Sequence, residues 1–205
     1  MELYYIERSF KPNKPLYWPQ ALINEKATPE ILSYRDDLVD DVIEQIKSQE
    51  ENVQAAGTAN VANLFIAQLY MKEIERLRYL VSSYLRTRLW KIEEHALYIL
   101  QNETLRNRLS DKEFEVAQKY AEIERKALDD AFISLLPNDP LQRDEMVTAV
   151  PPELNRPVFC KVLEDVDVPL EDGAPLELSK NDIVLTRYSY IRDVANEDNS
   201  PIQFI

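Results

Sequence analysis

Glycine is nearly absent from this sequence, and its scarcity excludes several classes of enzyme. Only Gly57 and Gly173 occur among the 205 residues. Loops that cradle phosphate groups and the turns of dinucleotide-binding folds need clustered glycines, because the backbone must approach the ligand closely. The chain therefore offers no candidate site of either kind.

Cysteine and histidine each occur once, as Cys160 and His95. One cysteine cannot form a disulfide framework or a cysteine-rich zinc site, and every metal motif with two histidines is absent. Cys160 alternates with valines, which is typical of a core thiol in a strand. His95 lies near the end of an expected helix, where we interpret it as a packing residue. We therefore expect no enzyme, and neither catalytic residues, cofactor nor metal.

Long apolar runs are also missing. No stretch of about 18 apolar residues occurs, and the N-terminal stretch MELYYIERSFKPNK lacks the apolar segment of a secretory signal. We expect a soluble protein that is neither secreted nor bound to a membrane. The net charge is −13, which argues against strong direct binding to DNA and favours protein partners.

The main feature that is present is a helical pattern from Ile66 to Leu100, a stretch without glycine or proline. Apolar residues recur there at spacings of three and four, which predicts one long, well-buried helix with neighbours on more than one side. Trp90 lies outside the main stripe, and it either fills a second core layer or anchors a partner subunit. The stripe consists of Ile66, Leu69, Tyr70, Ile74, Leu77, Val81, Tyr84, Leu85, Ile92, Ala96 and Ile99.

Basic residues crowd the middle of the same stretch, at Arg78, Arg86, Arg88 and Lys91. Arg88 falls inside the apolar stripe, where an unpaired cation is costly. We favour pairing with a carboxylate from another segment. The alternatives are a side chain that extends to the surface, and local pairing at a spacing of four residues.

Shorter patterns surround the central helix. Residues 1–17 predict an extended arm with aromatic anchors, and residues 20–26 a short helix. Thr28 followed by Pro29 is typical of the start of a further helix. Residues 36–54 predict an amphipathic helix whose acidic N-terminal end complements the helix dipole; a metal site is the alternative. Ser110 to Glu113 form a capping box that opens a helix ending at Pro137.

The pattern changes after Pro137. Prolines punctuate residues 137–156, which predict a linker with at most a short helix around residues 141–147, and Gly173 predicts a turn. Beyond the linker the apolar period becomes two, so that Val158, Cys160 and Val162 face one way. Short strands are expected at residues 158–163, 176–178, 183–188, 190–194 and 202–205.

These patterns predict an α+β multidomain chain, in which an N-terminal α-helical bundle domain precedes a small C-terminal β-strand domain. The expected parts are an arm (1–17), a helical domain (18–136), a linker (137–156) and a β-domain (157–205). About fifty residues in short strands are too few for much independent stability, so we expect the β-domain to dock on something.

Several motifs together resemble one family. The stretches Glu75–Tyr79, Tyr84–Leu89 and Lys91–Glu93 resemble the core signature of the Sld-five type of subunit in the eukaryotic GINS complex. The similarity extends to the stretches Pro29–Leu32, Leu135–Pro137 with Leu141–Gln142, Val158–Phe159, Arg187–Tyr188 with Ile191, and Ile202–Ile205. It covers roughly residues 18 to 205.

This resemblance implies a non-catalytic scaffold in the nucleus, one of four related subunits of a heterotetramer. In the family, the tetramer joins the minichromosome-maintenance ATPase ring and its cell-division-cycle cofactor into the active replicative helicase. It also implies contacts, through the complex, with DNA polymerase epsilon and a trimeric replisome hub protein. In this family the N-terminal tail can carry an acidic and apolar peptide for that hub, whereas residues 1–17 here are aromatic and basic.

We take nine residues as candidates for partner interfaces, with Arg86 and Arg88 expected to pair with carboxylates at subunit junctions. Two alternatives remain: a helical interaction module of an unrelated nuclear complex, and an enzyme with a carboxylate site, which would need a deep acidic pocket. The nine candidates are Arg78, Arg86, Arg88, Trp90, Lys91, Tyr188, Ile202, Phe204 and Ile205.

Overall fold

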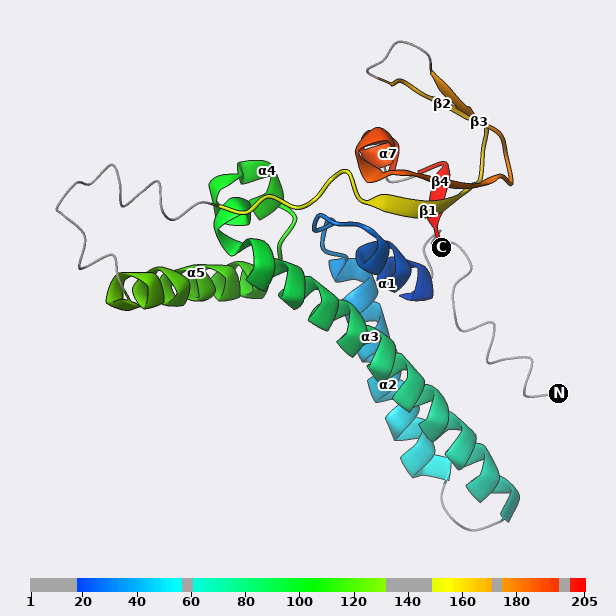
Figure 1. Ribbon diagram of the computed structural model, residues 1–205. Helices are drawn as coiled ribbons and strands as arrows, with labels where there is room; N and C mark the ends of the chain where they lie inside the picture. The colour runs from blue at the N-terminus through cyan, green and yellow to red at the C-terminus, as the bar shows by residue number, and fades with distance from the viewer. Residues whose placement is uncertain (1–17, 57–60, 132–148, 171–174, 196–199) are drawn as a thin grey trace. The chain divides into compact units, whose positions relative to one another are not determined.

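A computed structural model describes residues 18–56, 61–131, 149–170, 175–195 and 200–205 (Figure 1). These residues belong to two compact units, Thr28–Leu154 and a second unit that combines the N-terminal residues up to Ala27 with Asn155–Ile205. The expected arm, the end of a helix at Pro137, the short helix around residues 141–147 and the turn at Gly173 lie outside the described residues. The predicted fold class, a helical bundle followed by a small β-domain, is confirmed.

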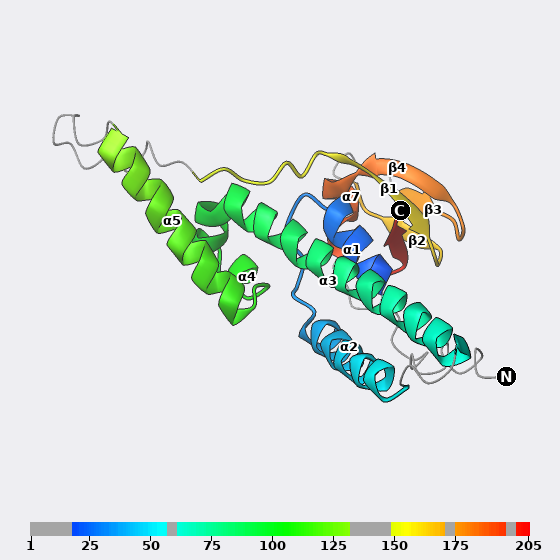
Figure 2. The ribbon, with the colours of Figure 1, turned by 90° about the horizontal axis from the view of Figure 1, so that it is seen from below.

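The unit Thr28–Leu154 is helical, with α2 (Asp36–Ala56), α3 (Val61–Gln101), α4 (Glu103–Arg106) and α5 (Asp111–Ala131). α2 and α3 lie side by side as an antiparallel pair, and α5 packs against α3 (Figures 1 and 2). The predicted helices at residues 36–54 and 66–100, and the one that follows the capping box, are therefore confirmed. α3 has one non-helical residue, His95 (φ −123°, ψ 23°).

The core of this unit follows the predicted stripe only in part. From Ile74 onward the stripe is buried except for the half-buried Leu85, and Leu38, Val39 and Val42 of α2 are buried as well. Near the start of α3 the prediction is wrong, because Ile66 is 40% and Leu69 47% exposed. A further buried cluster unites the C-terminal part of α3 with its neighbours: Ile31, Ile92, Ile99, Leu105 and Ala117.

The other unit contains α1 (Trp18–Ala27), β1 (Pro157–Val162), β2 (Val166–Val168), β3 (Leu176–Leu178), β4 (Ile183–Arg187), α7 (Tyr188–Ala195) and β5 (Ile202–Phe204). Its main sheet is antiparallel in the order β4-β1-β5, and β2 and β3 form a separate hairpin. β1 alternates as predicted, since Val158, Cys160 and Val162 are buried. β2 has no counterpart among the expected strands.

α1 belongs to this second unit, whereas the expected helical domain started at residue 18. The side-chain amide of Gln20 explains the association, because its Nε2 donates to the carbonyl of Phe204 at 2.8 Å, and Gln203 donates to Gln20 in turn. α1 thereby covers the edge of β5 that does not pair with β1.

Two local predictions are wrong. The expected strand at residues 190–194 lies within helix α7, because Tyr188 and Ile191, both fully buried, are three residues apart and share one helix face. The helix expected to start at Pro29 does not form. Residues 28–35 have no regular structure, and their carbonyls accept bonds from distant side chains, as described below.

Candidate partner-interaction surfaces

Arg88, in the middle of α3, is fully buried and densely bonded. Its Nε and one terminal nitrogen donate to the two carboxylate oxygens of Glu113 on α5, at 2.8 and 2.9 Å. The guanidinium also donates to the carbonyls of Leu32 at 2.7 Å and Arg108 at 3.0 Å. A two-pronged ion pair with additional carbonyl bonds offsets the cost of removing both charges from water.

Glu113 has a second role at the start of α5. Its Oε2 accepts a bond from the backbone N–H of Ser110 at 3.0 Å, and the hydroxyl of Ser110 accepts one from the N–H of Glu113 at 3.3 Å. The predicted capping box is thus confirmed. One carboxylate caps α5 and also fixes α5 to α3.

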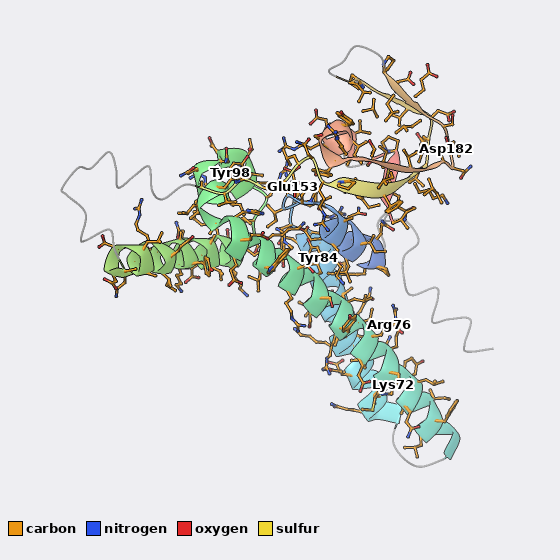
Figure 3. The ribbon with its side chains drawn as sticks, viewed as in Figure 1. Lys72, Arg76, Tyr84, Tyr98, Glu153 and Asp182 are labelled. Carbon is orange, nitrogen blue, oxygen red and sulfur yellow. The ribbon has the colours of Figure 1, made fainter. Side chains whose placement is uncertain are left out.

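Two tyrosine rings complete the surroundings of Arg88. The guanidinium carbon lies 5.2 Å from the ring centre of Tyr34 and 5.6 Å from that of Tyr84, which lies midway along α3 (Figure 3). Burial raises the pKa of the Tyr34 phenol above its usual range, and the nearby negative charge of Glu113 adds to the rise. The phenol therefore stays neutral beside the ion pair.

Cationic side chains also hold the irregular segment that precedes α2. Three consecutive carbonyls, of residues 30–32, accept bonds from Lys91 (2.9 Å), Arg108 (2.9 Å) and Arg88 (2.7 Å). Lys91 also donates to the hydroxyl of Thr28 at 3.2 Å. We call Arg88, Lys91 and Arg108 the cation clamp. It supplies the bonds that a helix would have made internally, so the segment is fixed without regular structure.

The cation clamp corrects part of the interface prediction. Arg88 does pair with a carboxylate from another segment, as favoured, but that segment is α5 of the same chain rather than a sister subunit. Lys91 is 4% exposed and bonded within its own unit. Since neither side chain reaches the surface, Arg88 and Lys91 are structural residues of the helical unit.

The side of α3 that faces away from Arg88 and Lys91 is exposed and partly aromatic. Tyr79 is 64% and Trp90 58% exposed, and Arg86 and Leu89 are exposed beside them. Tyr79, Arg86 and Trp90 follow one another at spacings of seven and four residues, so they share one helix face. We call these four residues the outer face of α3. The interpretation of Trp90 as part of a second core layer is therefore wrong within the described chain.

Arg78 is exposed and pairs with Glu50 of α2, so it links the two helices at the surface.

The first turns of α3 expose a further apolar group, none of whose residues was among the nine interface candidates. Residues on more than one side of the helix contribute, and the wide apolar surface of this stretch was the available signal in the sequence. The group consists of Leu64, Phe65, Ile66, Leu69 and Met71.

The interface candidates near the C-terminus also divide into buried and exposed residues. Tyr188, Ile202 and Phe204 are buried within their own unit, where the rings of Tyr188 and Phe204 lie 6.2 Å apart between centres. Ile205 is 60% exposed. The first three support the fold of this unit, and only Ile205 lies at its surface.

Ile205 belongs to a larger apolar surface on the sheet. Leu185 pairs with Phe159, and the N–H of Ile205 donates to the carbonyl of Phe159, so the three form a row across β4, β1 and β5. Ile183 extends this row along β4, and all four side chains are more than half exposed. We call them the sheet patch. The run Ile183–Leu185 was a missed signal, because both faces of that strand are apolar.

Metal binding and thiol chemistry find little support among the described residues. Among the described residues, no group of three or more His, Cys, Asp or Glu side chains could hold a metal ion. None of the described helices has a stretch long and apolar enough to traverse a lipid bilayer. Burial raises the pKa of the Cys160 thiol, which disfavours the reactive thiolate. A ring nitrogen of His95 lies 3.0 Å from the carbonyl of Val150.

Comparison with known proteins agrees with this division into units. Residues 38–132 match the family described as "GINS complex protein helical bundle domain", and residues 152–199 match "DNA replication complex GINS protein SLD5 C-terminus". The chain is 32% identical over 196 residues to the DNA replication complex GINS protein SLD5 of Debaryomyces hansenii, covering 84% of this chain and 79% of that protein. The chain belongs to the Sld5 family of GINS proteins.

Other members of the Sld5 family are similarly related. The Homo sapiens SLD5 protein is 31% identical over 185 residues, covering 84% of this chain and 81% of its own length. The Schizosaccharomyces pombe protein is 29% identical over 177 residues, with 83% of each chain covered. The helical-bundle match starts at residue 38, after α1, which agrees with the association of α1 with the C-terminal unit.

Proposed function

We propose that this chain is a non-catalytic scaffold subunit of a nuclear GINS heterotetramer. Its relatives carry the name of a DNA replication complex, and membership of the Sld5 family is the observation that supports the proposal most directly. The tetramer would join the minichromosome-maintenance ATPase ring to its cell-division-cycle cofactor. The ring would supply the energy, and this chain would supply binding surfaces.

The exposed side chains supply the physical support for a scaffold. Tyr, Trp and Arg dominate binding energy in protein interfaces, and the outer face of α3 presents Tyr79, Arg86 and Trp90 together. Exposed aromatic side chains that gather on one helix face mark a candidate interaction site. Arg78 and Ile205 are the other exposed candidates from the sequence. We assign the outer face of α3 to contact with a sister subunit.

The acidic charge supports protein contacts rather than a direct grip on DNA. A net charge of −13 opposes the phosphate backbone. Contacts with DNA polymerase epsilon and with the trimeric hub protein would then be made through the assembled complex.

The decisive experiment is purification of the tagged chain from its own cells at native salt, followed by identification and counting of the co-eluting proteins. We expect three other small GINS subunits at one copy each. Co-elution with an unrelated nuclear complex would support the interaction-module alternative. Recovery of the chain from its cells as a lone monomer, with no co-eluting partner, would overturn the scaffold proposal.

A further inference from the structure

The sheet patch is an apolar surface on the unit that contains the main sheet. Ile183, Leu185, Phe159 and Ile205 are 68%, 55%, 56% and 60% exposed. The opposite face of the same sheet is covered by α7, since Tyr188 and Phe204 are in contact there. One face of the sheet is therefore packed, and the other is open among the described residues.

We propose that residues 1–17 of the same chain cover the sheet patch. These residues lie outside the described part of the structure. They lead directly into Trp18, the first residue of α1, and Gln20, two residues later, donates to the Phe204 carbonyl at 2.8 Å. The residue to which the arm is joined therefore lies near β5, the strand that is followed by Ile205.

The arm is long enough to reach the whole patch. Seventeen extended residues span roughly 50 Å, whereas crossing from β5 over β1 to β4 takes only about 10 Å. Because the arm is tethered at the edge of the patch, its effective concentration there is on the order of millimolar. Even weak contacts then suffice to keep the patch covered.

The composition of the arm matches the surface. Its aromatic residues are Tyr4, Tyr5, Phe10 and Tyr17, and such rings bury large apolar areas against a pleated surface. The arm also carries three basic and two acidic side chains, whereas residues 155–205 carry five basic and ten acidic ones. The arm therefore has a net charge of +1 and residues 155–205 one of −5, and this opposite sign favours their contact.

The proposal can be tested with added cysteines, because Cys160 is the only native one and is 0% exposed. The full chain, purified with its co-eluting partners, receives either Leu185→Cys in the patch or Ser179→Cys as an exposed control outside it. Each cysteine variant is prepared in two forms, one with the native arm and one in which serine replaces Tyr4, Tyr5 and Phe10. The rate of maleimide labelling is measured.

We expect loss of the arm's aromatic rings to raise labelling at Leu185→Cys about tenfold, as follows if the covered state outweighs the open one by about ten to one. Labelling at Ser179→Cys should not change. Slow labelling at Leu185→Cys with either form of the arm means that another protein covers the patch, and fast labelling with both means that nothing does. Either result overturns the proposal.

A second measurement identifies the occupant directly. Phe159 is replaced by p-benzoylphenylalanine in the same complex, prepared from a mixture of isotopically heavy and light chains. Cross-linked peptides from residues 1–17 of the same chain are expected. Cross-links to a second copy or to another subunit overturn the proposal. Co-elution of partners is recorded in parallel, so failure of arm docking is distinguishable from failure of the proposed scaffold function.

Discussion

Replacement of Arg88 by methionine should destabilise the helical unit severely. Methionine keeps much of the side-chain volume but leaves the carboxylate of Glu113, whose side chain is 7% exposed, without its cation. Breaking a buried ion pair from one side costs about 3–5 kcal/mol. The carbonyl of Leu32, which loses its bond from Arg88, contributes about 1 kcal/mol to that cost, whereas the carbonyl of Arg108 keeps its bond from the N–H of Tyr34. Since domains are stable by only about 5–15 kcal/mol, Arg88→Met should remove between about a fifth and all of the total.

The assay is urea unfolding of the full chain, followed by far-ultraviolet circular dichroism, which reports mainly on the helices. Arg106→Met is the matched control, because Arg106 is an exposed residue of α4. It should change the free energy of unfolding by no more than about 0.5 kcal/mol. The denaturant slope should be equal in all variants if only stability changes.

A double variant separates the buried charge from the lost carbonyl bonds. Arg88→Met combined with Glu113→Gln removes the uncompensated carboxylate while keeping an amide that can accept the Ser110 bond. The double variant should recover about 1–3 kcal/mol of what Arg88→Met loses. The reasoning is refuted if Arg88→Met costs no more than Arg106→Met, or if the double variant is no more stable than the single one.

Three further predictions concern other parts of the chain. Lys91→Met should lower the free energy of unfolding by about 1–3 kcal/mol in the same urea assay, and a neutral result would mean that residues 28–32 do not need this cation. Trp90→Ala should leave stability unchanged but weaken binding to the sister subunit at least about thirtyfold by calorimetry, as expected of a central aromatic anchor; unchanged affinity would remove Trp90 from the interface. Burial raises the pKa of Cys160 above its usual value of 9.0, so the unfolded chain loses the thiol proton first and stability should fall as the pH rises past about 9. The free energy of unfolding, measured with urea at several pH values, should decline less steeply with pH in Cys160→Ala. An equal decline in both proteins would contradict the prediction.

Periodicity predicted the long elements because local pattern and burial agree there. α2, α3 and β1 each carry an apolar face with the spacing of their final structure, and the capping box located the start of α5. The helix predicted to start at Pro29 was wrong for a reason that the local sequence pattern does not reveal. The bonds that fix the carbonyls of residues 30–32 come from side chains 56 to 77 positions away in the sequence.

The candidate interface was predicted only in part, because residue type does not determine exposure. Arg86 and Arg88 are two positions apart in one basic cluster, yet one is exposed and the other is 0% exposed. On a helix, positions two apart point in nearly opposite directions. The stripe pattern placed Arg88 inside, but its partner Glu113 became evident only from the packing of α5 against α3.

The motifs that carry the family resemblance are largely those that hold the fold together. The stretches Tyr84–Leu89 and Lys91–Glu93 supply Arg88 and Lys91, and their carbonyl partners lie in the stretch Pro29–Leu32. Two separate parts of the signature therefore bind one another inside a single chain. Such residues identify the family without contacting a partner, because a partner can reach only the exposed positions between them. The specificity of this subunit should accordingly reside in the exposed side chains of α3. Tyr79, Arg86 and Leu89 lie within the signature stretches, and Trp90 lies between two of them.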